Sequence, residues 1–591
     1  MYLRHIQRKK NGKEHSYWSI VESRRLADGR VSQRHVLYLG EINDAQERAW
    51  ARAVEVFPDE AGPPQTMALF PEERLATTDE DIPIVRLRLK ELSVQRPRQW
   101  GACWLALYLW HELQLDRFWR ERLQPSRKGT RWDLVLAVLT VYRLLAPGSE
   151  WRLHRQWFES SALADLLGVD VGAADPHKLY GCHDQILAHK SALFSHLVQR
   201  WRDLFDAQFD VLLYDLTSTY FESEPPLDEN DKRRFGYSRD KRPDCVQVVI
   251  ALIVTPQGFP LTYEVLAGNT SDKTTLKEFL QKIEQQYGQA RRIWVMDRGI
   301  PTEENLATMR ASAPPVQYLV GTPKGRLTKL EKDLVEKPWQ QARPGVTVKL
   351  LPREGELYVL ARSADRVAKE RAMRRRQLKK LWQRLHELQA MKLRREDLLM
   401  KLGAARQQAP SAWRLVEVEV DATAATFTYH LKKDKLRLVR RREGRYLLRS
   451  NLTETDPAAV WSYYLQLVQV EQAFRNLKGD LALRPIFHQE QTRIEAHIFV
   501  SFLAYCLHVT LGQWLRTLAP GLTTRSVLEK FAAVQMVDVH IPTSDGRTLL
   551  LSRYTQPEPD LQLLLARLKL ELPPQPPPRI TAAAGGKEAA M

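Results

Sequence analysis

Apolar residues follow an alternating pattern at the start of the chain. Within residues 1–60, the stretches "HSYWSIVES" and "VSQRHVLYLG" flank "ADGR", in which Asp28 and Gly29 form a dipeptide typical of a hairpin turn. We therefore expect a small β-rich module here. Residues 61–99 begin with a Pro-rich and acidic stretch, which predicts a linker.

Helical periodicity replaces this pattern over residues 100–205. Candidate helices are "WLALYLWHELQLDRFWRERL", "RWDLVLAVLTVYRLL" and "SEWRLHRQWFESS". Ala-Pro-Gly at 146–148 separates the last two, so a helix-turn-helix that reads DNA is one interpretation. Because tight turns join helices in any helical domain, a purely structural role remains open.

Continuous apolar runs typical of buried strands dominate residues 206–300. These runs are "FDVLLYDLT", "CVQVVIALIV", "FPLTYEVLAG" and, after a helical stretch at 272–288, "RRIWVMDRG". Turn residues at 254–259 predict a hairpin between the second and third strands. A helix then carries the chain to the fourth strand, and this order resembles the opening of a ribonuclease-H-like sheet.

A long interruption, residues 301–444, precedes the next strand pattern, "RYLLRSNL". Its helical middle, 362–406, holds 15 Lys or Arg against five acidic residues, which indicates either a solvated helical face or a DNA-contacting insertion. Residues 445–515 are expected to complete the core, and 516–572 to form a C-terminal region. The Pro-rich tail 573–591 is expected to be disordered.

Charge is the part of the composition that narrows the function. The chain carries 89 Lys and Arg against 71 Asp and Glu, a formal net charge of +18, which favours a polyanionic partner such as nucleic acid. The four scattered cysteines form no C-x-x-C pair and favour a reducing compartment. The N-terminus lacks the apolar core of a secretory signal, and the apolar stretch 498–515 contains His508 and Gln513, so we expect a buried helix rather than a membrane span.

Two aspartates each follow an apolar run. Asp215 ends the run from Val211 to Tyr214, and Asp297 ends the run from Ile293 to Met296. A carboxylate at the end of a buried strand is costly unless a cation pairs with it. Either aspartate alone could be a turn residue, but two of them at successive strand ends indicate a site. Other acids compete for the role: Glu222, Asp240, Asp244, Glu264 and Asp272.

A third carboxylate lies on a predicted helix. In "WSYYLQLVQVEQAFRNLKGDLALRP", the apolar residues Val470, Phe474, Leu477 and Leu481 mark a core stripe. A neighbouring face holds Tyr464, Val468, Glu471, Arg475 and Lys478. Glu471 and Lys478, two turns apart, could hold a metal ion and a phosphate side by side, although ordinary surface charge would give the same pattern.

Five ordered blocks resemble DDE-type insertion-sequence transposases of the insertion-sequence-4-like group, and its 1634 branch in particular. The blocks are "YDLTSTYFE", "GYSRDKRPDCVQVVIALIVTPQGFPLTYEVLAGNTSDKTTL", "WVMDRGIPTEENLA", "YLVGTPKGRL" and "VEQAFRNLKGDLALRPIFHQEQTRIEAHIFVSFLAY". The resemblance implies an α/β fold: a ribonuclease-H-like catalytic core with a long helical and β insertion, preceded by a small β module and a helical domain.

The resemblance also implies site residues. Asp215, Asp297 and Glu471 map onto the three metal-binding carboxylates. The group's helical signature of Tyr, Arg, Glu and Lys maps onto Tyr464, Leu467, Glu471 and Lys478, so the arginine is leucine here and Arg475 could supply a similar charge. Further DNA-binding candidates are Arg298, beside Asp297, and the basic run Arg374, Arg375 and Arg376.

The implied reaction is phosphoryl transfer with two Mg²⁺ ions, for which Mn²⁺ can substitute. Mg²⁺ prefers oxygen ligands, so three carboxylates and no histidine or cysteine cage is the expected set. The expected partners are double-stranded DNA, as element ends and target, and further copies of the chain in a homodimer or larger assembly on DNA. The expected setting is the bacterial cytoplasm, at the nucleoid, with no membrane. A nuclease that does not transfer strands, or a catalytically silent DNA-binding relative, is the alternative.

Overall fold

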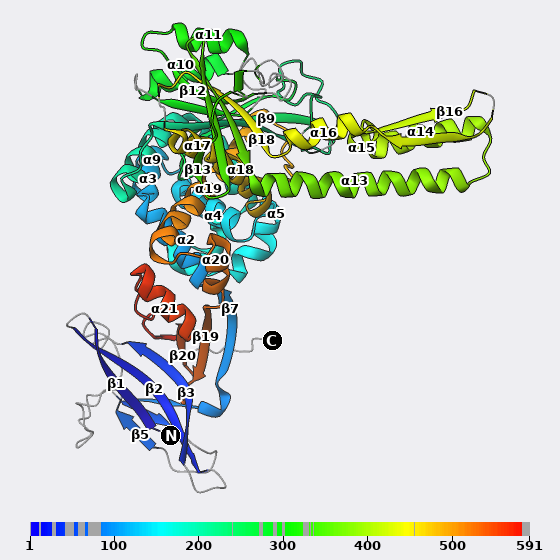
Figure 1. The fold of residues 1–591 in the computed structure, drawn as a ribbon. Helices are drawn as coiled ribbons and strands as arrows, with labels where there is room; N and C mark the ends of the chain where they lie inside the picture. Colours follow the sequence, from blue (N-terminus) through cyan, green and yellow to red (C-terminus); the bar gives the residue numbers. More distant parts are fainter. Residues whose placement is uncertain are drawn as a thin grey trace. The chain divides into compact units, whose positions relative to one another are not determined.

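The computed structural model describes residues 2–10, 13–25, 31–41, 53–56, 65–68, 84–270 without 239 and 241, 276–287, 292–297, and 302–581 without 323–329, 331, 332, 335, 423, 454 and 455. The chain forms two compact units. One consists of Met1–Arg200 with Arg475–Met591, and the other of Trp201–Phe474 (Figure 1).

The second unit contains a mixed nine-stranded sheet with the order β10-β9-β8-β11-β12-β18-β15-β14-β13. Its strands are β8 (Val211–Phe221), β9 (Val246–Val254), β10 (Pro260–Ala267), β11 (Ile293–Met296), β12 (Gln317–Thr322), β13 (Gln340–Arg343), β14 (Val346–Arg353), β15 (Glu356–Ser363) and β18 (Arg445–Ser450). β8, β9 and β10 are antiparallel neighbours, which confirms the predicted hairpin, whereas β11 runs parallel to both β8 and β12. The nine residues of β9 are all buried, as expected for a strand covered on both faces.

Helices connect and cover these strands. They are α10 (Leu276–Tyr287), α11 (Glu303–Ala311), α17 (Pro457–Leu465) and α18 (Leu467–Arg475). α17 begins at an N-cap, where Asp456 accepts hydrogen bonds from the amides of Ala458 and Ala459. α17 then packs on β12, β13 and β14. The Asp456 cap therefore fixes the start of the helical segment that leads into α18.

The segment 301–444 differs from the expected insertion. Four strands in it, β12 to β15, belong to the large sheet. The part that leaves the sheet is narrower, and we call it the arm: α13 (Ala364–Ala390), α14 (Arg395–Gln408), α15 (Pro410–Trp413), β16 (Val416–Val420), β17 (Phe427–Leu431) and α16 (Lys433–Arg442). α13 and α14 lie side by side in it (Figure 1). Leu381, Leu385, Leu402 and Phe427 belong to its own apolar core, so the arm is a packed substructure.

The first unit is mainly helical between β7 and α9, as the periodicity of residues 100–205 predicts. Its longer helices are α2 (Gly101–Glu112), α3 (Leu115–Arg122), α4 (Trp132–Leu145), α8 (Pro176–Ile186), α9 (Lys190–Phe205) and, after the second unit, α19 (Gln491–Leu518), α20 (Thr524–Ala532) and α21 (Pro559–Leu568). Shorter helical segments are α5 (Glu150–Arg152), α6 (Phe158–Ser160) and α7 (Leu163–Leu167). α19 packs against α2, α4 and α8.

α19 includes the apolar stretch 498–515. Among the described residues, α19 is the one helix that is long enough and apolar enough to cross a membrane. However, 89% of its most apolar window is buried within the protein. The expectation of a buried core helix is confirmed.

Strands occupy more of the N-terminal region than predicted. β1 (Tyr2–Lys10), β2 (Lys13–Arg25) and β3 (Val31–Glu41) form an antiparallel sheet, although Asp28 and Gly29 lie outside the described residues. The expected linker 61–99 contains β5 (Gln65–Ala68) and β6 (Ile84–Leu87), which flank β4 (Ala53–Val56) in a second sheet. It also contains β7 (Ser93–Gln99), which pairs with β19 (Gln535–Pro542).

The start of the C-terminal tail is ordered, contrary to the expectation for 573–591. β21 (Arg579–Thr581) pairs with β20 (Thr548–Tyr554), and the Gln575 side-chain amide exchanges hydrogen bonds with the backbone of Tyr554. Composition misleads here because a Pro-rich segment can still dock on a neighbouring strand. Residues 582–591 lie outside the described residues.

Candidate active site and nucleic-acid surface

Asp215 lies in β8, and Asp297 directly follows β11, the parallel neighbour of β8. The paired residues of β8 and β11 run from Val211 with Ile293 to Tyr214 with Met296, so Asp215 and Asp297 are the next residues in that register. Neighbouring strands lie about 4.8 Å apart, and side chains at matched positions point to the same face of a sheet. The backbones of Asp215 and Asp297 are therefore next to each other where the parallel pairing ends, and we expect their carboxylates to share one face.

The position of Asp215 within its strand corrects one expectation. β8 continues to Phe221, so Asp215 lies inside the strand and not at its end. The strand continues through three buried hydroxyl residues, Thr217, Ser218 and Thr219, whose backbones pair with β9. This backbone pairing lets small hydroxyl side chains occupy a covered sheet. Only the pairing of β8 with β11 ends near Asp215.

The environments of the two aspartates differ. Asp215 is half-buried, and its Oδ1 accepts a 2.8 Å hydrogen bond from the amide of Leu216. Asp297 follows the last residue of β11 and is exposed. One carboxylate is thus anchored in the sheet, and the other is open to solvent.

Glu471 belongs to the same compact unit as both aspartates and is exposed on α18. The predicted core stripe is confirmed, because Val470, Phe474, Leu477 and Leu481 are buried. Within the described parts of the chain, the two aspartates and Glu471 are not a group whose carboxylate oxygens all lie within 4.8 Å of one another. The structure thus brings the two aspartates together in the sheet and leaves the approach of Glu471 as a prediction.

The helix that carries Glu471 is not continuous to Lys478. α17 ends at Leu465, α18 ends at Arg475, and Asn476–Asp480 form a π-helical turn, η5, closed by a 2.9 Å bond from the amide of Leu481 to the carbonyl of Asn476. A π-turn rotates the following residues relative to an α-helix. The seven-residue spacing from Glu471 to Lys478 therefore spans an α-helical and a π-helical turn, and a shared face stays a prediction.

Several other candidates have structural partners. Tyr464 packs against Tyr446 and Trp461 in an aromatic cluster beside β18. Arg475 and Lys478 belong to the first compact unit. Arg298 lies outside the described residues.

The competing acids are held mostly in ion pairs. Glu222 and Asp244 both pair with Arg242, at 2.7 and 2.9 Å, and these hydrogen bonds lower the pKa of Asp244 to about 2. Glu264 pairs with Lys282. Because arginine or lysine balances their charges, Glu222, Asp244 and Glu264 have a structural role that makes them weak candidates for metal ligands.

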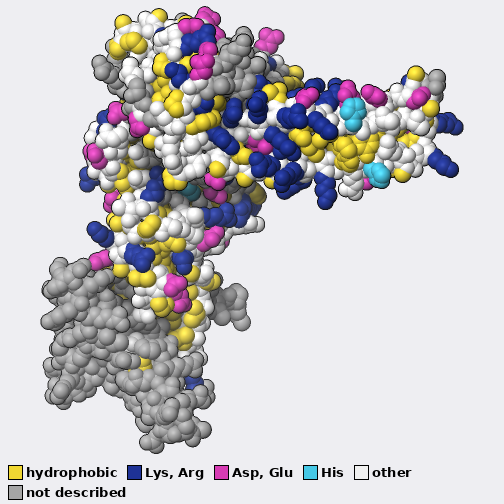
Figure 2. Space-filling view, viewed as in Figure 1, with side chains coloured by type: hydrophobic (Ala, Val, Ile, Leu, Met, Phe, Trp, Pro, Cys, Tyr) yellow, Lys and Arg dark blue, Asp and Glu magenta, His cyan; other side chains and the backbone are white. Residues whose placement is uncertain are grey.

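The arm presents a basic surface, but its three consecutive arginines are not equivalent. Lys and Arg side chains gather over the arm in Figure 2. Arg375 and Arg376 are exposed on α13, whereas Arg374 is only 10% exposed and its Nε lies 2.5 Å from Oε1 of the buried Glu443. Arg374 therefore joins α13 to the end of α16, and only its two neighbours are free to meet a phosphate.

A buried group in the first unit was missed by sequence reasoning. Glu150, His183, His488 and His497 come from four separate segments and share one site. Spacing gave no signal, since only the last two are near each other in sequence. The sequence favoured a hydrogen-bonded core histidine for His497, which agrees with its burial. His183 stands in a run with His177, Cys182 and Asp184 whose spacing fits no common zinc site.

Comparison with known proteins gives the family. Residues 206–507 match the transposase DDE domain, and residues 3–56 match the N-terminal domain of IS1634 family transposases. No curated protein matches the chain. A solved structure described as the piggyBac transposase synaptic complex with hairpin DNA is 9% identical, with a TM-score of 0.35, over 74% of this chain and 82% of that one. Because the DDE domain match covers half of the sequence and the N-terminal match names the branch, the chain belongs to the DDE transposases of the IS1634 type.

Proposed function

We propose that the protein cuts DNA at the ends of an insertion sequence and transfers the 3′ ends to target DNA. The observation that carries this proposal is the adjacent placement of Asp215 and Asp297 on parallel strands in a chain of the transposase family. A net charge of +18 supports DNA as the partner.

The proposed core has a ribonuclease-H-like fold. Three antiparallel strands, β8, β9 and β10, are followed by α10 and by two strands, β11 and β12, on the other side of β8. This agrees with the sheet that the family resemblance implies. β18, β15, β14 and β13 extend the same sheet beyond β12.

We assign Asp215, Asp297 and Glu471 as ligands of two Mg²⁺ ions. The donor set fits, because Mg²⁺ is bound by carboxylate oxygens and keeps several waters. When bound, the ions would activate the attacking oxygen and neutralise the departing one. The Leu216 amide holds one oxygen of Asp215 in a fixed orientation, and the exposure of Asp297 leaves its carboxylate accessible to DNA.

Cations of the chain would position the DNA. Lys478, as a point charge, would hold a phosphate near the cut, with Arg475 taking the place of the family arginine that is Leu467 here. Arg298 follows Asp297 directly in sequence. Arg375 and Arg376 would contact phosphates farther along the duplex, which fixes register without reading bases.

The same site would act twice. Water would first release a 3′-hydroxyl, and that hydroxyl would then attack the target phosphate in line with its leaving oxygen. Joining two element ends favours a homodimer or larger assembly on DNA. A nuclease without strand transfer would share the first step, so only the second step separates the two functions.

The test is cleavage and strand transfer with labelled element ends, using Asp297→Ala. We expect no cleavage and near-normal DNA binding, since phosphate contacts depend on Lys and Arg. Asp244→Asn is the matched control, because Asp244 is exposed and paired with Arg242, and it should cut normally. Normal cleavage by Asp297→Ala would move the chemistry to another acid, and cleavage by the unmodified protein without transfer would favour the nuclease.

A further inference from the structure

A buried polar group lies among the helices of the first unit. It contains Glu150 of α5, His183 of α8, His497 of α19, and His488 in the segment before α19. These side chains are 6% exposed or less. They come from both of the sequence segments that make up this unit, 1–200 and 475–591.

Three imidazole nitrogens surround one carboxylate oxygen. Glu150 Oε1 is 3.4 Å from His488 Nε2, 3.5 Å from His497 Nδ1 and 3.8 Å from His183 Nε2. The donor atoms of Glu150, His488 and His497 all lie within 4.8 Å of one another. A tetrahedral ion with ligands at about 2.0–2.1 Å holds its donors roughly 3.3 Å apart. The spacing is therefore close to that of a bound zinc ion.

Several of these nitrogens lack hydrogen-bond partners among the described residues. Both ring nitrogens of His183 and Nε2 of His497 are buried and have no hydrogen-bond partner in the part of the chain that the structure describes. A buried polar atom without a hydrogen-bond partner is energetically costly, so these atoms need an explanation.

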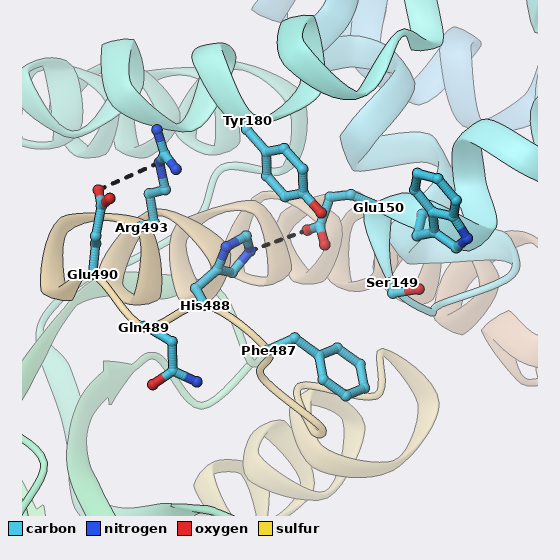
Figure 3. A pocket seen from close by; sticks show the side chains of 9 residues that line it. Ser149, Glu150, Tyr180, Phe487, His488, Gln489, Glu490 and Arg493 are labelled. Atoms are coloured by element: carbon cyan, nitrogen blue, oxygen red, sulfur yellow. Dashed lines mark hydrogen bonds and ion pairs between the residues drawn. The ribbon is translucent and has the colours of Figure 1, made fainter. Parts of the chain in front are cut away.

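A pocket provides access to the group. It has a volume of about 450 Å³, and Glu150 and His488 both line it, together with Tyr180, Phe487 and Arg493. Figure 3 shows the carboxylate of Glu150 and the ring of His488 pointing toward each other at its wall. An ion could therefore enter from solvent without unfolding the helices.

Arg143 is the competitor for this site. Its Nη2 lies 3.4 Å from His497 Nδ1 and 3.9 Å from Glu150 Oε1, so the guanidinium balances the carboxylate when no ion is bound. Its Nη1 also donates to the carbonyl of Ala482, at 3.1 Å. The hydrogen bond to Ala482 can hold the guanidinium after its contact with His497 is lost to an ion. The positive charge of Arg143 would still weaken the binding of a dication.

We propose that Glu150, His488 and His497 bind a Zn²⁺-class ion that joins the two sequence segments of the first unit. Nitrogen and carboxylate ligands in a tetrahedral arrangement suit zinc better than magnesium, which prefers six oxygens. The site is independent of the proposed catalytic carboxylates. Its ion would stabilise the fold and would not take part in DNA cutting.

The test uses the full chain after treatment with a chelator. Co²⁺ is titrated first, because tetrahedral Co²⁺ with nitrogen and oxygen ligands has characteristic visible absorption. Zn²⁺ then competes for the same site. We expect about one ion per chain, loss of the Co²⁺ bands on Zn²⁺ addition, and a higher melting temperature with Zn²⁺. The absence of tetrahedral bands together with an unchanged melting temperature would overturn the proposal.

Variants locate the ion. His488→Ala and Glu150→Gln should each weaken Zn²⁺ binding at least tenfold, while His111→Ala, an exposed histidine 58% accessible, should leave it unchanged. If a variant fails to fold, the Co²⁺ spectrum of the unmodified protein still decides. Repeating the titration with Asp297→Ala separates the two proposals, because that variant should retain the Zn²⁺ site whether or not Asp297 is catalytic. Equal affinity in all folded variants would place the ion elsewhere and refute the assignment.

Discussion

Replacing Arg375 and Arg376 together with glutamine should weaken DNA binding mainly at low salt. Both side chains are exposed on α13, within the basic surface of the arm (Figure 2). Arg374, which directly precedes them in α13, forms an ion pair with Glu443, with 2.5 Å between Nε and Oε1. The structure therefore allows two phosphate contacts from this run, where the sequence alone suggested three.

The magnitude follows from counterion release. Each phosphate contact contributes about 0.9 to the slope of log K against log salt, so the double variant should flatten that slope by about 1.8. Between 50 and 200 mM salt, one contact corresponds to roughly a 3.5-fold change in affinity and two to roughly 12-fold. The difference between variant and unmodified protein should therefore shrink by about that factor as salt rises.

The assay is fluorescence anisotropy with a labelled duplex at several salt concentrations. Arg127→Gln with Lys128→Gln is a matched control, because these two cations are exposed and consecutive in the first unit. Arg374→Gln serves a second purpose: it should lower the melting temperature, since breaking a buried ion pair is destabilising by about 3–5 kcal/mol. A salt slope for the double variant equal to that of the control would refute a role for the arm in binding DNA.

Three other outcomes are expected. Burial raises the pKa of Asp538, but hydrogen bonds from Arg98 and Ser552 together with the charges of Arg98 and Arg96 outweigh it, so the net pKa is depressed. The protein should therefore lose stability as pH falls below about 4, and thermal melts of Asp538→Asn should show a flatter pH profile. Gly268→Ala should lower the free energy of unfolding by about 1–3 kcal/mol, because the new Cβ would clash with the backbone carbonyl oxygen of Gln247. The urea midpoint should fall accordingly, and an unchanged midpoint would contradict this. Ca²⁺ should support binding of element ends without cleavage, because its loose geometry does not align the reacting oxygens, and full cleavage in Ca²⁺ would argue against the Mg²⁺ assignment.

Local patterns were sufficient to predict the strands that carry the aspartates. The apolar runs before Asp215 and Asp297 correspond to β8 and β11, and the turn at 254–259 joins β9 to β10. The reason is that a strand buried on both faces must be apolar over several residues, which is visible in any window of sequence.

Features that depend on distant partners were not predictable in the same way. β8 continues past Asp215 because β9 pairs with its hydroxyl residues, and β13 to β15 join the sheet through β18, which lies far along the chain. In sequence Arg374 cannot be distinguished from Arg375 and Arg376, because its partner Glu443 lies 69 residues away. The grouping of Glu150 with His488 and His497 likewise had no sequence signal, since these histidines lie more than 300 residues away from it.

The most direct measurement for the central claim is metal rescue of Asp297→Cys. A thiolate binds Mn²⁺ better than it binds Mg²⁺, because sulfur is a softer ligand than oxygen. If Asp297 is a metal ligand beside Asp215, the variant should cut element ends poorly in Mg²⁺ and recover at least tenfold in Mn²⁺, relative to the same change of metal for the unmodified protein. Full activity in Mg²⁺, or equal inactivity in both metals with DNA binding intact, would contradict the assignment.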